Sequence, residues 1–193
     1  MTKFEFIKYW NENYPNSLPI ENELVGKYEN RWFRIHSLPD SKRYAENEYE
    51  YNQILERQNK LITDIFGNNT DFQILIGLYQ NDTMNENYEF LDYLNTFIKI
   101  MNIDLHKEKP DIYEDEMSYE IYVKQEKWNI NDYNEILKKI ADDEIRAIFI
   151  NPQQNSLIIP YDGGVDVILK NTEERDRFKS KYADWISKRE DGL

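Results

Sequence analysis

The spacing of hydrophobic residues along the chain predicts about five helices. The clearest covers residues 48–66, where apolar side chains recur every three or four positions and form one stripe facing a core. Residues 67–69, Gly-Asn-Asn, are typical of a left-handed cap at the end of that helix. The same spacing predicts helices over residues 2–14, 86–101 and 131–141, and a last one that begins at Thr172.

Other segments have the patterns of β-strands. Residues 31–38 alternate between the two faces of a strand, and residues 72–79 are so apolar that we expect a central strand covered on both faces. Shorter runs at 119–123, 147–150, 157–159 and 165–169 also predict strands. Because helices and strands do not alternate regularly, the pattern predicts an α+β fold. We expect a mostly antiparallel sheet of five to six strands with about five helices packed on it, in a single domain over residues 1–193.

The chain is strongly acidic, with a net charge of −13 from 24 lysines and arginines against 37 acids. This charge repels nucleic acids and anionic lipid surfaces. It favours a basic partner, although many soluble proteins are acidic without one. The N-terminus lacks the basic and apolar regions of a signal peptide, and no apolar run reaches the ~18 residues of a membrane span. We therefore expect a cytoplasmic protein with neither a nucleic-acid nor a membrane partner.

The motifs of several common enzyme classes are missing from the sequence. The chain has no cysteine, which excludes disulfides, zinc ribbons, iron–sulfur clusters and thiol nucleophiles. It contains neither glycine-rich phosphate loop, GxxxxGK[ST] or GxGxxG, and no GxSxG nucleophile motif. Its two histidines, His36 and His106, cannot form an HExxH zinc site, and the acidic run 111–120 lacks the spacing of an EF-hand. We predict no metal and no cofactor, and the sequence identifies no catalytic residue.

One segment, residues 31–44 (RWFRIHSLPDSKRY), is basic within the acidic chain. Its bases are Arg31, Arg34, Lys42 and Arg43, and alternation places Arg34 and His36 on the same strand face, about 7 Å apart. Arginine binds carboxylates and phosphates through two parallel hydrogen bonds, so this cluster is a candidate anion site. The alternative is that these bases pair with neighbouring acids. His36 is either a general base or a packed, hydrogen-bonded strand residue.

A second segment, residues 160–166 (PYDGGVD), is typical of a tight turn between strands. Its paired glycines allow positive φ angles and close approach of the backbone, and Asp162 can hold an Asx turn. If Asp162 or Asp166 meets Arg34 in the fold, the pair is either a structural clamp or half of a binding site. The candidate ligand-binding residues of both segments are Arg31, Arg34, His36, Lys42, Arg43, Tyr161, Asp162 and Asp166.

These two segments resemble an uncharacterised bacterial domain-of-unknown-function family. The similarity lies in RWFRIHSLPDSKRY followed by a helix, and in YDGGVDVI followed by a helix that contains KYADWISKREDGL. The order of these features covers most of the chain. Many relatives carry an arginine in or beside the turn, where this chain has Gly163 and Gly164. The resemblance implies a shared fold and brings no established activity with it.

Two functions remain compatible with the sequence. The first is a non-enzymatic protein-interaction module, for example an immunity-type protein that binds a basic partner. Its support is the net charge, the abundance of tyrosine and the segment 111–120, which has five acids and no base. The second is an enzyme or ligand-binding domain for a small anion at Arg34, His36, Lys42 and Arg43. The sequence leaves the oligomeric state, the partner and any reaction open.

Overall fold

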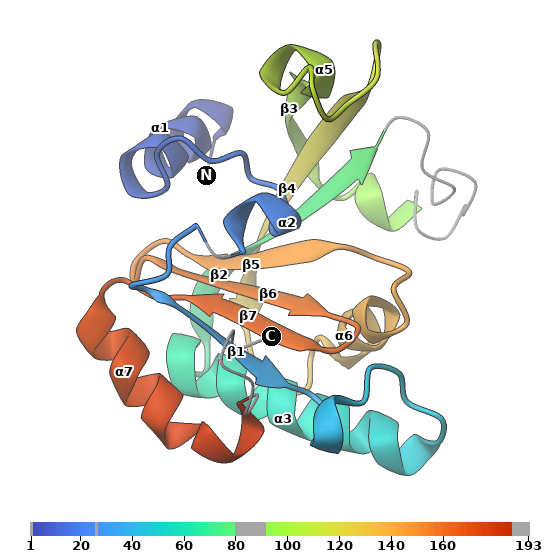
Figure 1. Ribbon diagram of the computed structural model, residues 1–193, viewed down its shortest axis with the longest axis vertical. Coiled ribbons are helices and arrows are strands. Elements are labelled where there is room, and N and C mark those ends of the chain that lie inside the picture. Colours follow the sequence, from blue (N-terminus) through green and yellow to red (C-terminus); the bar gives the residue numbers. More distant parts are fainter. Residues whose placement is uncertain (1, 26, 80–91, 187–193) are drawn as a thin grey trace.

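The strands of the protein form one antiparallel sheet (Figure 1). The computed structural model describes residues 2–25, 27–79 and 92–186, and this part of the chain contains seven strands. In sheet order they are β1 (Trp32–His36), β7 (Gly164–Ile168), β6 (Ser156–Tyr161), β5 (Ala147–Asn151), β2 (Thr70–Tyr79), β4 (Ser118–Trp128) and β3 (Ile98–Asp104). Every neighbouring pair runs antiparallel, so the predicted α+β class and antiparallel sheet are confirmed.

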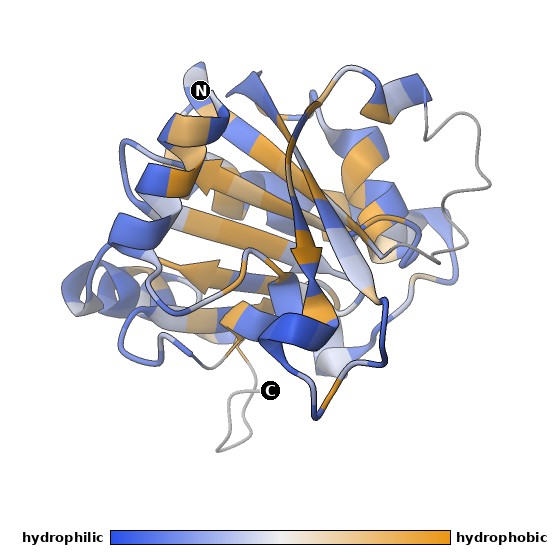
Figure 2. Cartoon of the chain, turned by 90° about the horizontal axis from the view of Figure 1, so that it is seen from above, coloured by the Kyte–Doolittle hydropathy of each residue, from blue (hydrophilic) through white to orange (hydrophobic). Residues whose placement is uncertain are grey.

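Helices cover both faces of the sheet (Figure 1). The first face is packed by α3 (Glu48–Phe66), α6 (Asn134–Ala141) and α7 (Thr172–Lys181). The second face is packed by α1 (Lys3–Asn13), α2 (Glu21–Leu24) and α5 (Leu105–Glu108). Two short 3-10 helices, Pro39–Ser41 and Ala183–Trp185, follow β1 and α7. The central strands are therefore buried on both sides, and Figure 2 shows them as largely hydrophobic.

The two faces have separate hydrophobic cores because side chains alternate along each strand. On β5, Phe149 belongs to the core under α3, whereas Ile148 and Ile150 belong to the core under α1 and α2. The alternation also governs β1, where Phe33 and Ile35 face α3 and the residues between them face α2. This arrangement decides on which side of the sheet each polar strand residue lies.

The ends of the longest helix follow from local sequence. Asn47 caps α3 by accepting a hydrogen bond from the backbone N–H of Glu50, at 3.1 Å. Gly67 ends the helix with a positive φ of 84°, as the sequence predicts for this position. No helix among the described residues is both long enough and apolar enough to cross a lipid bilayer.

Two of the sequence predictions are wrong. Residues 98–104 form β3 and not the end of a helix over residues 86–101, of which residues 86–91 lie outside the described part of the chain. Pairing with β4, which includes Ile98 and Ile103 and has an irregularity between Lys99 and Met101, makes this segment a strand. The sheet therefore has one strand more than the predicted maximum of six. Helices also outnumber the predicted five, because neither α2 nor α5 is among the predicted helices.

Candidate functional site

The central feature of the site is an ion pair between the first and last strands of the chain. In the β1–β7 register Arg34 lies directly opposite Asp166, and both face the α2 side of the sheet. Arg34 donates two hydrogen bonds to the carboxylate of Asp166, from Nε to Oδ1 and from NH2 to Oδ2, each at 2.8 Å. Trp32 donates a third, from Nε1 to Oδ1, also at 2.8 Å. Asp166 is buried, so it is a fully hydrogen-bonded internal carboxylate.

A second ion pair fixes the turn between β6 and β7. Asp162 is buried in this turn, and the guanidinium of Arg43 reaches it with NH2 at 2.8 Å from Oδ2. Arg43 itself is largely exposed, so the pair closes the outer rim of the site. Each aspartate of the PYDGGVD segment therefore forms an ion pair with an arginine of the basic segment 31–44.

The glycines of the turn allow close packing, and neither is needed for a positive φ angle. Neither Gly163 nor Gly164 has a positive φ. A Cβ atom at Gly164 would lie 2.0 Å from the backbone carbonyl oxygen of Ile35, so only glycine fits against β1 at this point. This contact brings the turn against the basic segment and is a physical reason for glycine at position 164.

Tyr161 lies between the two ion pairs. Its ring centroid is 4.7 Å from the guanidinium carbon of Arg34, which is a cation–π contact. Burial raises the pKa of Tyr161 to about 12, while Arg34 acts in the opposite direction. Tyr161 therefore keeps its proton at neutral pH and presents a neutral ring and hydroxyl.

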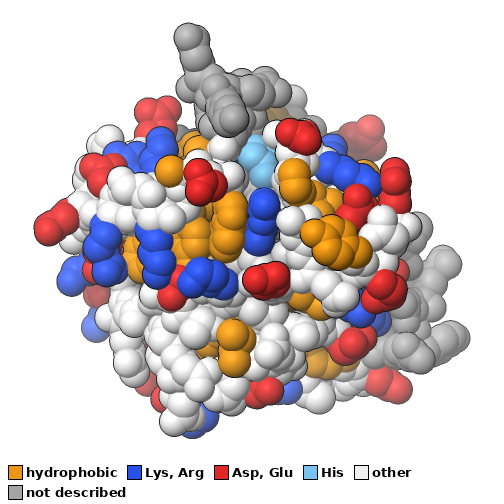
Figure 3. Space-filling view, turned by 90° about the horizontal axis from the view of Figure 1, so that it is seen from below, with side chains coloured by type: hydrophobic (Ala, Val, Ile, Leu, Met, Phe, Trp, Pro, Cys, Tyr) orange, Lys and Arg blue, Asp and Glu red, His pale blue; other side chains and the backbone are white. Residues whose placement is uncertain are grey.

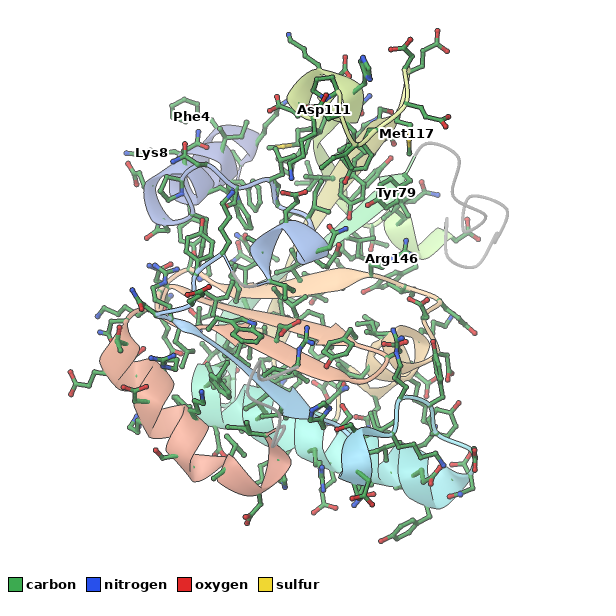
Figure 4. The ribbon with its side chains drawn as sticks, in the orientation of Figure 1. Phe4, Lys8, Tyr79, Asp111, Met117 and Arg146 are labelled. Atoms are coloured by element: carbon green, nitrogen blue, oxygen red, sulfur yellow. The ribbon has the colours of Figure 1, made fainter. Side chains whose placement is uncertain are left out.

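These side chains line a cavity of about 400 Å³, which we call the central cavity. Five of the eight candidate residues from the sequence contribute to it: Arg34, Arg43, Tyr161, Asp162 and Asp166. The sequence does not single out five further polar residues of its wall, which are Glu21, Asn22, Tyr79, Asp143 and Arg146. Figure 4 shows Tyr79 and Arg146 near one another, at the ends of β2 and β5. The volume is within the usual range for a small-molecule site.

Glu21 is the most unusual of these additional residues. It is the first residue of α2, and its Oε2 accepts a hydrogen bond from the hydroxyl of Tyr119 at 3.2 Å. Its other oxygen, Oε1, is buried and has no hydrogen-bond partner. Burial raises the pKa of Glu21, although a hydrogen bond from its own backbone N–H, the bond from Tyr119 and the charge of Arg146 lower it in part. Glu21 and Tyr119 are almost a hundred residues apart in the chain, so no local sequence pattern predicts that they meet.

Arg31 and Lys42, two other candidates from the sequence, do not line the central cavity. The guanidinium of Arg31 lies between the rings of Tyr14 and Tyr28, 5.2 and 5.1 Å from their centroids. The ammonium of Lys42 is 2.7 Å from the carboxylate of Glu50 on α3. Lys42 thus pairs with an acid, as the alternative interpretation expects, whereas Arg31 is held by aromatic rings.

His36 also lies outside the residues that line the cavity. Its Nε2 is 3.5 Å from the hydroxyl oxygen of Ser41. Burial lowers the pKa of His36, and the nearby charges of Arg34 and Arg57 lower it further. The imidazole is therefore neutral at pH 7, but the structure does not place it beside the two aspartates of the turn.

The central cavity has no clear excess of positive charge. Its ionisable acids and arginines are Glu21, Arg34, Arg43, Asp143, Arg146, Asp162 and Asp166. Arg34 and Arg43 are already paired with buried aspartates, so their charges are compensated within the protein. Nowhere in the described residues do three or more histidine, aspartate or glutamate side chains gather as metal ligands would.

A second surface of interest is the loop after α5, residues 109–117, which we call the acidic arm. It lies at the top of Figure 1, where β3 and β4 project beyond the rest of the sheet, and Figure 4 labels Asp111 and Met117 on it. Its carboxylates at positions 111, 114, 115 and 116 are exposed. Ile112, also on this loop, is 67% exposed. By contrast, both signs of charge are mixed on the face seen in Figure 3.

The fold and these contacts define an α+β protein in which an antiparallel sheet carries helices on both faces and an ion pair joins strands β1 and β7. Residues 20–190 match the family model described as Domain of unknown function (DUF3885), so the chain belongs to that family. The predicted resemblance to a family of this kind is confirmed. The comparisons with curated proteins and with solved structures gave no match. Helix α1 lies before the matched region.

Proposed function

We propose that the protein is a binding module for a small polar ligand, and that the central cavity is its site. The observation that carries this proposal is the convergence of both singled-out sequence segments on one cavity of about 400 Å³. Arg34 and Arg43 come from the first segment, and Asp162 and Asp166 come from the second. Apolar walls with a few converging polar groups and perturbed pKa values are typical of binding sites.

The chemistry of the cavity supports binding and not catalysis. The lining residues that the structure describes include no serine, lysine or histidine. The carboxylates of Asp162 and Asp166 are engaged by Arg43 and Arg34, so neither is free to contact a substrate without breaking an ion pair. The rigid pairs are well suited to keeping a cavity open and shaped before a ligand arrives, because preorganisation lowers the entropic cost of binding.

A substitution that fills the cavity tests this proposal. Asn22 is an exposed residue of α2 whose side chain lines the cavity, so Asn22→Trp should obstruct it while sparing the core. Asn11→Trp, on the exposed surface of α1, is the matched control. A library of small polar compounds is screened against all three proteins by saturation-transfer NMR. Compounds that bind wild type and Asn11→Trp but not Asn22→Trp support the proposal, whereas equal binding to all three refutes it.

A second candidate function is interaction with a basic protein, as an immunity-type protein would do. The specific observation in its favour is Ile112, an exposed apolar side chain that lies among the exposed carboxylates of the acidic arm in the sequence. Apolar anchors inside a charged rim are common at protein interfaces, and complementary charge accelerates association. This function uses a different surface from the central cavity, so the two proposals are tested separately.

The test of the second candidate begins with a tagged pull-down at low and high salt, followed by measurement of the association rate of the recovered protein. Asp111→Lys combined with Glu114→Lys should slow association with a basic partner at low salt. Glu56→Lys combined with Glu135→Lys changes the net charge equally on α3 and α6, which cover the opposite face of the sheet. Equal slowing by both double variants would show that the acidic arm has no specific role.

A further inference from the structure

We propose that the ligand of the central cavity is an uncharged, hydroxyl-bearing molecule, and that it forms a hydrogen bond with Oε1 of Glu21. This inference rests on the proposed function, since it names the ligand class of the same site. It differs from the anion that the basic segment suggests in the sequence.

The first step of the argument is the unsatisfied oxygen of Glu21. Oε2 accepts a hydrogen bond from the hydroxyl of Tyr119, while Oε1 is buried without a hydrogen-bond partner, and Glu21 is one of the residues that line the cavity. A buried polar atom without a partner costs free energy, and such atoms are rare in folded proteins. A ligand group that bonds to Oε1 would remove this cost.

The second step concerns charge. An anionic ligand would have to compete with Asp166 for Arg34 and with Asp162 for Arg43, and both aspartates are buried and already at 2.8 Å. A cationic ligand would lie among the guanidiniums of Arg34, Arg43 and Arg146. An anionic and a cationic ligand would each lie near wall groups of the same charge, so an uncharged ligand has the lowest electrostatic cost of binding.

The third step concerns the kind of uncharged group. The Oε1 atom of Glu21 is a hydrogen-bond acceptor when the carboxyl is ionised, and it can donate or accept when the carboxyl is protonated. A hydroxyl group both donates and accepts hydrogen bonds, so it satisfies Oε1 in both states. The rings of Tyr79 and Tyr161, together with Pro160, supply apolar wall for the carbon skeleton of such a ligand.

The experiment measures binding of three sets of probes to the full chain by isothermal titration calorimetry at pH 7. The uncharged probes are D-glucose, D-galactose, myo-inositol and adenosine. The anionic probes are inorganic phosphate and citrate, and the cationic probe is putrescine. We expect binding of at least one uncharged probe and of neither charged set.

Variants of α2 then test the role of Glu21. Glu21→Leu removes both oxygens and should weaken the bound probe by about tenfold, the equivalent of one lost hydrogen bond. Glu21→Gln retains a polar group for Tyr119 and for the ligand, so its affinity should stay within about threefold of wild type. Glu23→Gln is the matched control, because Glu23 pairs with Lys109 and does not line the cavity. Thermal melts establish that each variant is folded.

Each outcome has a distinct meaning. Binding of phosphate, citrate or putrescine alone, lost in Asn22→Trp, would overturn the ligand class and leave the proposed function standing. Undiminished binding of an uncharged probe to a folded Glu21→Leu would overturn the role of Glu21. No binding by any probe at millimolar concentrations, or binding that Asn22→Trp does not affect, would overturn both the ligand class and the cavity as its site.

Discussion

Removal of the Asp166 carboxylate tests how the ion pair at the centre of the site contributes to stability. The side chains of Arg34 and Asp166 are 14% and 3% exposed, so water compensates little for a missing partner. Breaking a buried pair from one side costs about 3–5 kcal/mol, because it leaves an uncompensated charge inside the protein. The hydrogen bond from Trp32 adds about 1 kcal/mol.

We therefore expect Asp166→Ala to lower the free energy of unfolding by about 4–6 kcal/mol, a large part of the typical total of about 5–15 kcal/mol. Urea titration followed by tryptophan fluorescence and circular dichroism measures this loss. Asp166→Asn keeps the shape and an acceptor oxygen, so it provides a milder variant if Asp166→Ala is too unstable to fold.

The double variant Arg34→Met with Asp166→Leu distinguishes an uncompensated charge from lost packing. Apolar replacement of both partners of a buried pair is often neutral, so we expect the double variant to be more stable than Asp166→Ala. A loss below about 1 kcal/mol for Asp166→Ala would place the pair in the class of exposed salt bridges. That result, or a double variant less stable than Asp166→Ala, would refute the reasoning.

Three further predictions concern the turn, the longest helix and the pH dependence of stability. Gly164→Ala places a Cβ 2.0 Å from the backbone oxygen of Ile35, so we expect a loss of about 3 kcal/mol or more, measured as a lower melting temperature. Asn47→Ala removes the side-chain cap on the N–H of Glu50 and should cost about 1 kcal/mol in urea titrations. Glu21 has a raised pKa in the folded state, so its carboxyl holds a proton more tightly there than in the unfolded chain, and the contribution of Glu21 to stability falls as pH rises above 4.5. Glu21→Gln, which resembles the protonated acid, should therefore be relatively more stable at pH 7 than at pH 4 when compared with wild type.

Each of these three predictions has a control or a contradicting result. An added Cβ at Gly163 meets side chains and no backbone atom, so Gly163→Ala should destabilise less than Gly164→Ala. An equal loss in both would show that strain against β1 is not the cause. If Asn47→Ala leaves the free energy of unfolding in urea unchanged, then water replaces the side-chain cap on the N–H of Glu50. A stability difference between Glu21→Gln and wild type that does not change between pH 4 and pH 7 would contradict the raised pKa.

The sequence alone determines those features that depend on neighbouring residues. Helical periodicity predicts α3 with its bounds, and alternation places Arg34 and His36 on one face of β1. The continuous apolar run of β2 predicts its burial on both faces. These predictions succeed because a side chain's direction follows from its position within its own helix or strand.

The tertiary structure decides what lies beside each of those faces. The sequence leaves open whether Asp162 or Asp166 meets Arg34, and the β1–β7 register pairs Arg34 with Asp166. It cannot bring Glu21 to Tyr119, because that contact depends on where α2 packs against β4. For the same reason the isoleucines of residues 98–103 fit a helix in isolation and become a strand only through pairing with β4. Contacts between distant segments depend on the packing of the whole core, which local patterns do not contain.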